Sequence, residues 1–182
     1  MVKCVLEDFA TKREKGISVV PVSVNISTMG MDNFDIVGEL NELAEQYDED
    51  KSLLNIEFTE SAAVVSPELF KQTIEDLRSS GFNVWMDDFG SGYSSLNSLK
   101  NFSFDLVKLD MEFLRHDENP RTWNIISGVA LMTKQLDMRL LAEGVETEEQ
   151  AQHLEEVGCD ILQGYFFAKP VPLEELKSSS EI

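Results

Sequence analysis

Six short apolar runs in this sequence each end in polar side chains, and nearly all of those side chains are good metal ligands. The clearest run covers residues 84–86 and leads directly into Asp87 and Asp88, which are followed by a turn rich in Gly and Ser. The other five runs end at Asn25, Glu57, Lys108 with Asp110, Glu143 and Gln163. Polar groups gathered at the ends of successive strands are typical of the catalytic face of an α/β enzyme.

Five of these side chains are carboxylates. If they gather at the carboxyl ends of the strands, in what we call the mouth of the fold, they require a counter-charge. Carboxylates that lie a few ångströms apart repel each other, so that some would have to stay protonated. A divalent cation removes that difficulty, and an oxygen-rich ligand set suits Mg²⁺ or Mn²⁺ better than Zn²⁺. The adjacent Asp87 and Asp88 could bridge two ions, and two ions about 3.5–4 Å apart are the usual machinery for attack on a phosphodiester. Lys108 would then hold the attacking water or the developing negative charge.

Simpler interpretations exist for several of these residues when each is taken alone. Asn25 and Gln163 would be ordinary polar groups at strand ends. Glu60 and Glu146 would be residues at helix starts, where the helix dipole favours acids. The Asp87–Asp88 pair is the hardest to explain in this way, because burying adjacent acids without a cation is costly.

The elements that would position these residues alternate along the chain. Strand-like apolar runs lie near residues 17–26, 53–59, 82–88, 104–110, 138–144 and 160–167. Stretches with helical spacing separate them, and residues 5–15 predict a helix that ends at Gly16. Strands that alternate with helices indicate right-handed βαβ units and a parallel sheet.

Six strand–helix units are too few for a closed eight-stranded barrel, which takes about 250 residues. An open doubly wound sheet is the alternative, but it predicts ligands at one crevice, not at all six strand ends. We therefore expect an α/β fold, an incomplete TIM-like (β/α) barrel of six parallel strands with flanking helices.

Composition narrows the class of protein. The 182 residues are 42% hydrophobic, which suffices for one core, and carry a net charge of −19, which argues against DNA, RNA and anionic membrane surfaces as partners. No apolar stretch is long enough to span a bilayer, and the N-terminus is too acidic for a signal peptide. Two cysteines make no disulfide framework, so we expect a cytoplasmic protein in which Cys4 and Cys159 are buried thiols.

These residues resemble the EAL domain, a bacterial family that hydrolyses the second messenger cyclic di-GMP to linear pGpG. The resemblance covers nearly the whole chain and rests on six motifs in the family's order: residues 25–27, 57–60, 87–96, 108–110, 142–147 and 163–165.

The resemblance implies a role for each matching residue. Asn25, Glu57 and Asp87 would ligate the first of two Mg²⁺ or Mn²⁺ ions, and Asp87 with Asp88 would engage the second. Lys108 would orient the water nucleophile, and Glu143 would support the metal-bound water.

The remaining matching residues would support the mouth. Asp110 and Gln163 would hold it together through hydrogen bonds, and Glu60 would anchor the loop that follows Asp88. Glu146 and Gly164 are further candidates for binding substrate or supporting a loop.

One departure from the family pattern changes the expected activity. The Glu-Ala-Leu motif that names the family carries a metal-ligand Glu on the second barrel strand, and it does not occur before Asn25. We therefore expect a single domain over residues 1–182, truncated at its N-terminal side so that the first two barrel strands are absent, with a frayed tail over 176–182. This chain would be weakly active or inactive alone. The alternative is a non-catalytic module that binds cyclic di-GMP or another protein.

The predicted architecture also bears on partners. An incomplete barrel leaves two sheet edges unpaired, and such edges favour self-association. The resemblance further implies a GGDEF or sensor domain in a longer parent protein and a location in the bacterial cytoplasm.

Overall fold

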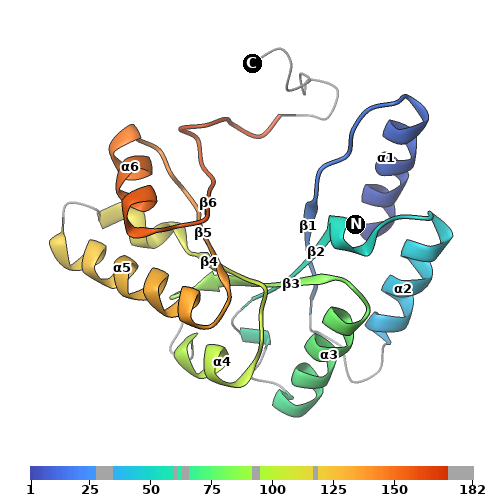
Figure 1. The fold of residues 1–182 in the computed structure, drawn as a ribbon, viewed down its shortest axis with the longest axis horizontal. Helices are drawn as coiled ribbons and strands as arrows, with labels where there is room; N and C mark the ends of the chain where they lie inside the picture. Colours follow the sequence, from blue (N-terminus) through green and yellow to red (C-terminus); the bar gives the residue numbers. More distant parts are fainter. Residues whose placement is uncertain (28–34, 60, 63–65, 92–94, 117–118, 172–182) are drawn as a thin grey trace.

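The computed structural model describes all residues except 28–34, 60, 63–65, 92–94, 117–118 and 172–182 (Figure 1). Six strands form one sheet in the order β1-β2-β3-β4-β5-β6, and every neighbouring pair is parallel. Their bounds are β1 Val22–Asn25, β2 Leu54–Thr59, β3 Asn83–Phe89, β4 Leu106–Leu109, β5 Arg139–Ala142 and β6 Ile161–Leu162. The order of pairing follows the chain, as in a barrel wound in one direction.

Helices flank the curled sheet on its outer side, so that the described strands form a half-barrel (Figure 1). β1 pairs with β2 and β6 pairs with β5, and neither strand pairs with a further strand in the part of the chain that the structure describes. The predicted incomplete TIM-like barrel is therefore confirmed. The helices are α1 Val2–Glu14, α2 Ile36–Gln46, α3 Pro67–Ser79, α4 Ser95–Asn101, α5 Pro120–Gln135 and α6 Glu148–Val157, with 3-10 turns η2 Lys51–Leu53 and η4 Met111–His116.

Local sequence signals explain where several helices begin and end. The carboxylate of Asp35 accepts a hydrogen bond from the Gly38 N–H at the start of α2 (2.9 Å). Thr147 and Gln150 form a reciprocal capping box at the start of α6, which ends at Gly158 with a left-handed backbone (φ 90°). The helix predicted over residues 5–15 spans Val2–Glu14. The helix α4 and both 3-10 turns were not predicted, because they are too short to show a period.

The two faces of each strand have different surroundings. Outward side chains, such as Ile56, Met86 and Val107, belong to the main core between sheet and helices. A second, smaller cluster of Trp85, Leu106 and Leu141, with Ile161 packed against it, lies on the opposite face, which is the inner face of the half-barrel.

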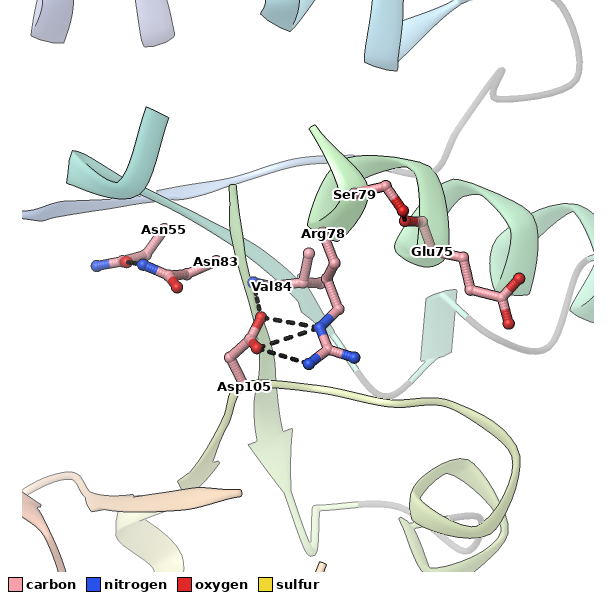
Figure 2. A network of polar contacts seen from close by, with 7 residues as sticks. All are labelled: Asn55, Glu75, Arg78, Ser79, Asn83, Val84 and Asp105. Atoms are coloured by element: carbon pink, nitrogen blue, oxygen red, sulfur yellow. Dashed lines mark hydrogen bonds and ion pairs between the residues drawn. The ribbon is translucent and has the colours of Figure 1, made fainter. Parts of the chain in front are cut away.

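The amino ends of the strands are held by side chains that bond to the main chain of a neighbouring strand. Asp105, just before β4, accepts a hydrogen bond from the Val84 N–H of β3 (2.8 Å) and a bidentate pair from the Arg78 guanidinium (Figure 2). Asp160, just before β6, accepts in the same way from the Leu140 N–H of β5 (2.8 Å). These contacts fix the end of the half-barrel opposite to the predicted site.

Two further expectations can be compared with the structure. Cys4 is exposed and Cys159 is only partly buried, so the prediction of two buried thiols is wrong for Cys4. Cys4 lies on the face of α1 away from the residues that pack into the core, which are Val2, Leu6 and Phe9. No helix in the described ranges is long and apolar enough to cross a membrane. The predicted frayed tail, 176–182, lies outside the described residues.

Candidate active site at the carboxyl ends of the strands

A buried lysine lies at the centre of the predicted site. The Lys108 ammonium, on β4, lies 2.8 Å from Asp87 Oδ1 on β3 and 2.9 Å from Glu143 Oε1 just after β5. It lies 3.2 Å from Glu57 Oε1 on β2. Four strand ends that are far apart in the sequence therefore meet at the Lys108 ammonium, as the prediction of a common mouth requires.

Strand periodicity explains this convergence. Successive side chains of a strand point to opposite faces, so Trp85 and Asp87 share the inner face of β3, while Leu106 and Lys108 share that of β4. The inner apolar cluster therefore lies one layer beneath the charged groups. The Lys108 side chain is only 8% exposed, so its ion pairs lie in a water-poor setting, where electrostatic contacts are stronger.

Asn25 extends the cluster to β1. Its Nδ2 donates a hydrogen bond to Glu57 Oε2 (3.0 Å), and the two residues are register partners across the β1–β2 pair. The other carboxylate oxygen, Glu57 Oε1, contacts the Lys108 ammonium, but it is buried and accepts no hydrogen bond with acceptable angles among the described groups. This oxygen therefore keeps lone pairs available to a further donor or a cation.

The adjacent acids Asp87 and Asp88 differ in their settings. The Asp88 N–H donates to Asp87 Oδ1 (3.0 Å). Asp88 itself has a left-handed backbone (φ 57°), at the point within β3 where the register against β4 shifts between Met86 and Phe89. Ser91 bonds to the Asp88 carbonyl through both its N–H (3.1 Å) and its hydroxyl (2.8 Å). Burial, followed by the negative charges of Asp87, Asp110 and Glu143, raises the pKa of Asp88.

Lys108 keeps its charge in this setting. Burial alone would lower the pKa of its ammonium, but hydrogen bonds to Asp87 and Glu143 and the charges of Glu143 and Glu57 outweigh burial and raise it. With the acids as its charged neighbours, the group is therefore a cation at neutral pH. A cation at this position can orient an anion or a water molecule.

The other predicted residues take more local positions. Asp110 Oδ1 accepts a hydrogen bond from the Glu112 N–H (2.6 Å), which starts η4. The Glu146 side chain is exposed, and its N–H donates to Gln150 Oε1 (2.8 Å). Gln163 is exposed, and its main chain pairs with Ala142 and Val145.

Gly164 and Glu60 complete the set. Gly164 lies against the Val145 main chain so closely that a Cβ would overlap its N, C and O atoms. Glu60 lies outside the described residues, so its predicted role as a loop anchor stays a prediction.

The donor chemistry of the site fits a divalent cation. The ligands predicted from the sequence, Asn25, Glu57, Asp87 and Asp88, can offer oxygen atoms. The buried Glu57 Oε1 contacts the Lys108 ammonium but accepts no hydrogen bond among the described groups. Five carboxylates against one ammonium leave the mouth strongly negative. Lys108 lies between the acids and offsets one of these charges, and the described ranges hold no group of three acidic, histidine or cysteine side chains arranged to hold a metal.

Comparison with known proteins agrees with this geometry. The family model described as EAL domain matches residues 1–170. Cyclic di-GMP phosphodiesterase RocR of Pseudomonas aeruginosa is 33% identical over 169 residues, which are 91% of this chain and 43% of RocR. The structure titled "PaMucR Phosphodiesterase, c-di-GMP complex" superposes with a TM-score of 0.86 at 28% identity over 96% of this chain and 71% of that one.

A manganese complex is also among the similar structures. The Klebsiella pneumoniae BlrP1 manganese/cy-diGMP complex has a TM-score of 0.81 at 27% identity and matches 93% of this chain and 44% of that one. This chain spans from a fifth to less than half of the length of curated relatives such as the signaling protein YkoW of Bacillus subtilis (20%) and RocR (43%).

Proposed function

Because this chain belongs to the EAL domain family, we propose that it carries the metal-binding and water-orienting part of a cyclic di-GMP phosphodiesterase. The observation that carries this proposal is the meeting of Glu57, Asp87 and Glu143, from three different strands, within 3.2 Å of one buried ammonium. The names of RocR and of the MucR complex, which mention cyclic di-GMP phosphodiesterase and c-di-GMP, support this substrate.

Two Mg²⁺ or Mn²⁺ ions would be held by Asn25, Glu57, Asp87 and Asp88. The oxygen donors of this set and the manganese in the BlrP1 complex support such ions. When bound, they would supply positive charge that polarises the phosphodiester and makes water more acidic.

Lys108 and Glu143 would act on the water and the substrate. The Lys108 ammonium, fixed by two short contacts, would orient the attacking water or stabilise charge that develops on a phosphoryl oxygen. Glu143 is the most exposed acid partner of Lys108 (23%, against 4% for Glu57 and 11% for Asp87). It would therefore meet the incoming water and accept its hydrogen bond. The apolar layer of Trp85, Leu106 and Leu141 would keep further water from entering beneath.

We expect this chain alone to turn over cyclic di-GMP slowly or not at all. The described half-barrel is open between β1 and β6, so substrate would meet walls on only part of its surface. The second candidate function is a non-catalytic module that binds cyclic di-GMP or another protein. It is favoured by the Lys108 ammonium, which already lies between Glu57, Asp87 and Glu143 where a metal ion would be expected.

Two assays on the purified chain separate these functions. Calorimetric titration with cyclic di-GMP, in Mn²⁺, Mg²⁺ or chelator, measures binding, and chromatographic detection of pGpG measures hydrolysis. Cyclic di-GMP binding that requires Mn²⁺ or Mg²⁺ and is lost in Glu57→Gln, with or without slow pGpG formation, supports the phosphodiesterase part. Binding of equal strength in chelator and in Glu57→Gln, without pGpG, supports the non-catalytic module. No cyclic di-GMP binding under any of these conditions contradicts both roles in cyclic di-GMP recognition.

We also propose a bacterial cytoplasmic setting, self-association through the open sheet edges and a GGDEF or sensor domain in a longer parent protein. The two edge strands support self-association. The small share of YkoW and RocR that this chain matches supports further domains in the parent.

A further inference from the structure

The six-residue turn η4 directly follows the strand that carries Lys108. β4 ends at Leu109, and Asp110 starts the turn by accepting hydrogen bonds from the Glu112 N–H at its side chain (2.6 Å) and from the Phe113 N–H at its carbonyl (3.1 Å). The turn η4 is therefore tied to the end of β4, and it also contacts two loops at the carboxyl ends of the strands.

The first of these loops begins directly after β3, which carries Asp88 and ends at Phe89. Gly90, two residues after Asp88, has a left-handed backbone (φ 95°), and a Cβ at this position would overlap the ring of Phe113. Phe113 is half-buried and packs against the main core, so its ring cannot move aside freely. The ring therefore limits where the loop can run after Asp88.

The second loop carries Glu143. Gly144 also has a left-handed backbone (φ 72°), and a Cβ there would lie 2.5 Å from the Cβ of Met111 and 3.3 Å from its Cα. The Glu143 N–H donates to the Leu109 carbonyl (3.2 Å), which continues the β4–β5 ladder up to this residue. The Cβ and Cα of Met111, a residue that is itself 40% exposed, therefore leave no room for a side chain at the point where the loop leaves the sheet.

The far end of η4 is also fixed. Leu114 is 3% exposed, and its carbonyl accepts a hydrogen bond from Gln150 Nε2 at the start of α6 (3.3 Å). Gln150 Oε1 in turn accepts from the Glu146 N–H, beyond Glu143 in the same loop (2.8 Å). The turn is thus held at both ends while its first half touches both loops.

We propose that Phe113 and Met111 are positioning residues that hold Asp88 and Glu143 on the two sides of Lys108. This inference rests on the proposed function, in which those acids meet the metal and the water. Residues that contact the metal ligands, and so fix their orientation, affect the affinity for the metal without touching the ion. Neither side chain offers a donor to the site, so packing alone carries the effect.

Matched glycine substitutions test these contacts. Gly90→Ala (φ 95°) meets the Phe113 ring, whereas Gly158→Ala (φ 90°) meets nothing within 4 Å. Gly144→Ala (φ 72°) meets Met111, whereas Gly16→Ala (φ 69°) meets nothing within 4 Å. Each pair shares the cost of a left-handed backbone. Because the control glycines also lie farther from the site, the contact with η4 itself is isolated by a double variant that removes the Phe113 ring as well.

Calorimetric titration with Mn²⁺ supplies the first readout. Gly90→Ala and Gly144→Ala are expected to weaken Mn²⁺ binding about tenfold or more, and Gly158→Ala and Gly16→Ala to leave it unchanged. Adding Phe113→Ala to Gly90→Ala should restore part of the lost affinity, because removing the ring makes room for the new Cβ. Equal losses within each pair, or no restoration in the double variant, would overturn the inference.

Amide hydrogen exchange separates failure of this inference from failure of the proposed function. If the unsubstituted chain binds no Mn²⁺, the proposed metal site is wrong, and exchange then decides the positioning role. The Ser91 N–H bonds to the Asp88 carbonyl, and the Glu143 N–H bonds to the Leu109 carbonyl. Faster exchange at Ser91 in Gly90→Ala and at Glu143 in Gly144→Ala, but not in their controls, supports the inference. Equal rates within the pairs overturn it.

Discussion

The Lys108 ammonium lies 2.8 Å from Oδ1 of Asp87, between the inner rows of β3 and β4. Both side chains are nearly buried, at 8% and 11% exposed, and no other residue of the described cluster carries a positive charge. Without a divalent ion, this contact and the two beside it supply the positive charge that offsets part of the negative charge of the mouth. Stability and metal binding are therefore coupled at Lys108.

Replacing Lys108 by Met should reveal this coupling. In metal-free buffer, Lys108→Met is expected to lower the free energy of unfolding by about 3–5 kcal/mol, because buried acids lose their counter-charge. Mn²⁺ should restore part of that loss by binding the folded state. Urea denaturation with and without Mn²⁺ measures both effects. The control is Lys100→Met, on the exposed side of α4, which should change neither value, and an unchanged midpoint in Lys108→Met would contradict the prediction.

Asp105→Ala should destabilise the fold without changing the site. It leaves the Val84 N–H and the Arg78 guanidinium without their acceptor (Figure 2), so the expected loss in the free energy of unfolding is about 1–3 kcal/mol. Arg78→Ala removes only a partly exposed ion pair and should cost less than about 1 kcal/mol. Urea denaturation ranks the two variants, and a larger loss in Arg78→Ala would show that the main-chain bond matters less than the ion pair.

The two thiols should differ in reactivity. Burial, and then the charge of Asp160, raises the pKa of the Cys159 thiol to about 12, whereas Cys4 is exposed. An aromatic disulfide reagent at pH 8 should therefore label Cys4 quickly and Cys159 slowly in the folded protein, and both quickly in urea. Equal labelling rates in the folded protein would contradict this.

The same shift gives a pH dependence of stability. Between the ordinary cysteine pKa of about 8.5 and the folded value, the unfolded chain releases the Cys159 proton while the folded chain keeps it. The unfolded state then binds fewer protons, so the free energy of unfolding falls as pH rises through this window. Cys159→Ser should remove this contribution, which urea denaturation at several alkaline pH values can measure.

Gly164→Ala should displace the segment that follows β6. A Cβ at this position would overlap the Val145 main chain, which cannot move as a side-chain tip can, so the expected loss is about 1–3 kcal/mol. Gly128→Ala, in α5 with nothing within 4 Å, should instead stabilise the protein by up to about 1 kcal/mol. Thermal or urea unfolding distinguishes these opposite signs, and a neutral Gly164→Ala would show that the contact is relaxed in solution.

Self-association should depend on exposed apolar residues near the two edge strands. Val20, just before β1, is 65% exposed, and Phe167, after β6, is 54% exposed. Sedimentation velocity should show association that increases with concentration and weakens in the double variant Val20→Lys, Phe167→Lys. Leu131→Lys, equally exposed on α5, is the control for added charge. A monomer at every concentration would contradict the prediction.

The strands and site residues that could be predicted from the sequence are those whose apolar patterns are long and regular. The apolar runs that became β2 and β3 are long and are followed directly by polar residues, so both the strands and their functional ends could be predicted. The turn η4 has no period of its own, and the roles of Phe113 and Met111 could not be inferred from it. The one local signal was Asp110, whose side chain can start such a turn. Cys4 was misplaced because residue type alone predicts burial only on average.

The sequence by itself determined six parallel strands, the polar residue at the end of each and a family resemblance that the comparisons confirmed. Those features follow from local periodicity and from motifs that are contiguous in the chain. Only the tertiary structure decided that Lys108 lies among Glu57, Asp87 and Glu143, and that glycines in two loops pack against η4. The physical reason is that strand tilt, side-chain direction and close packing bring together residues that are far apart in the sequence, and no local pattern encodes those distances.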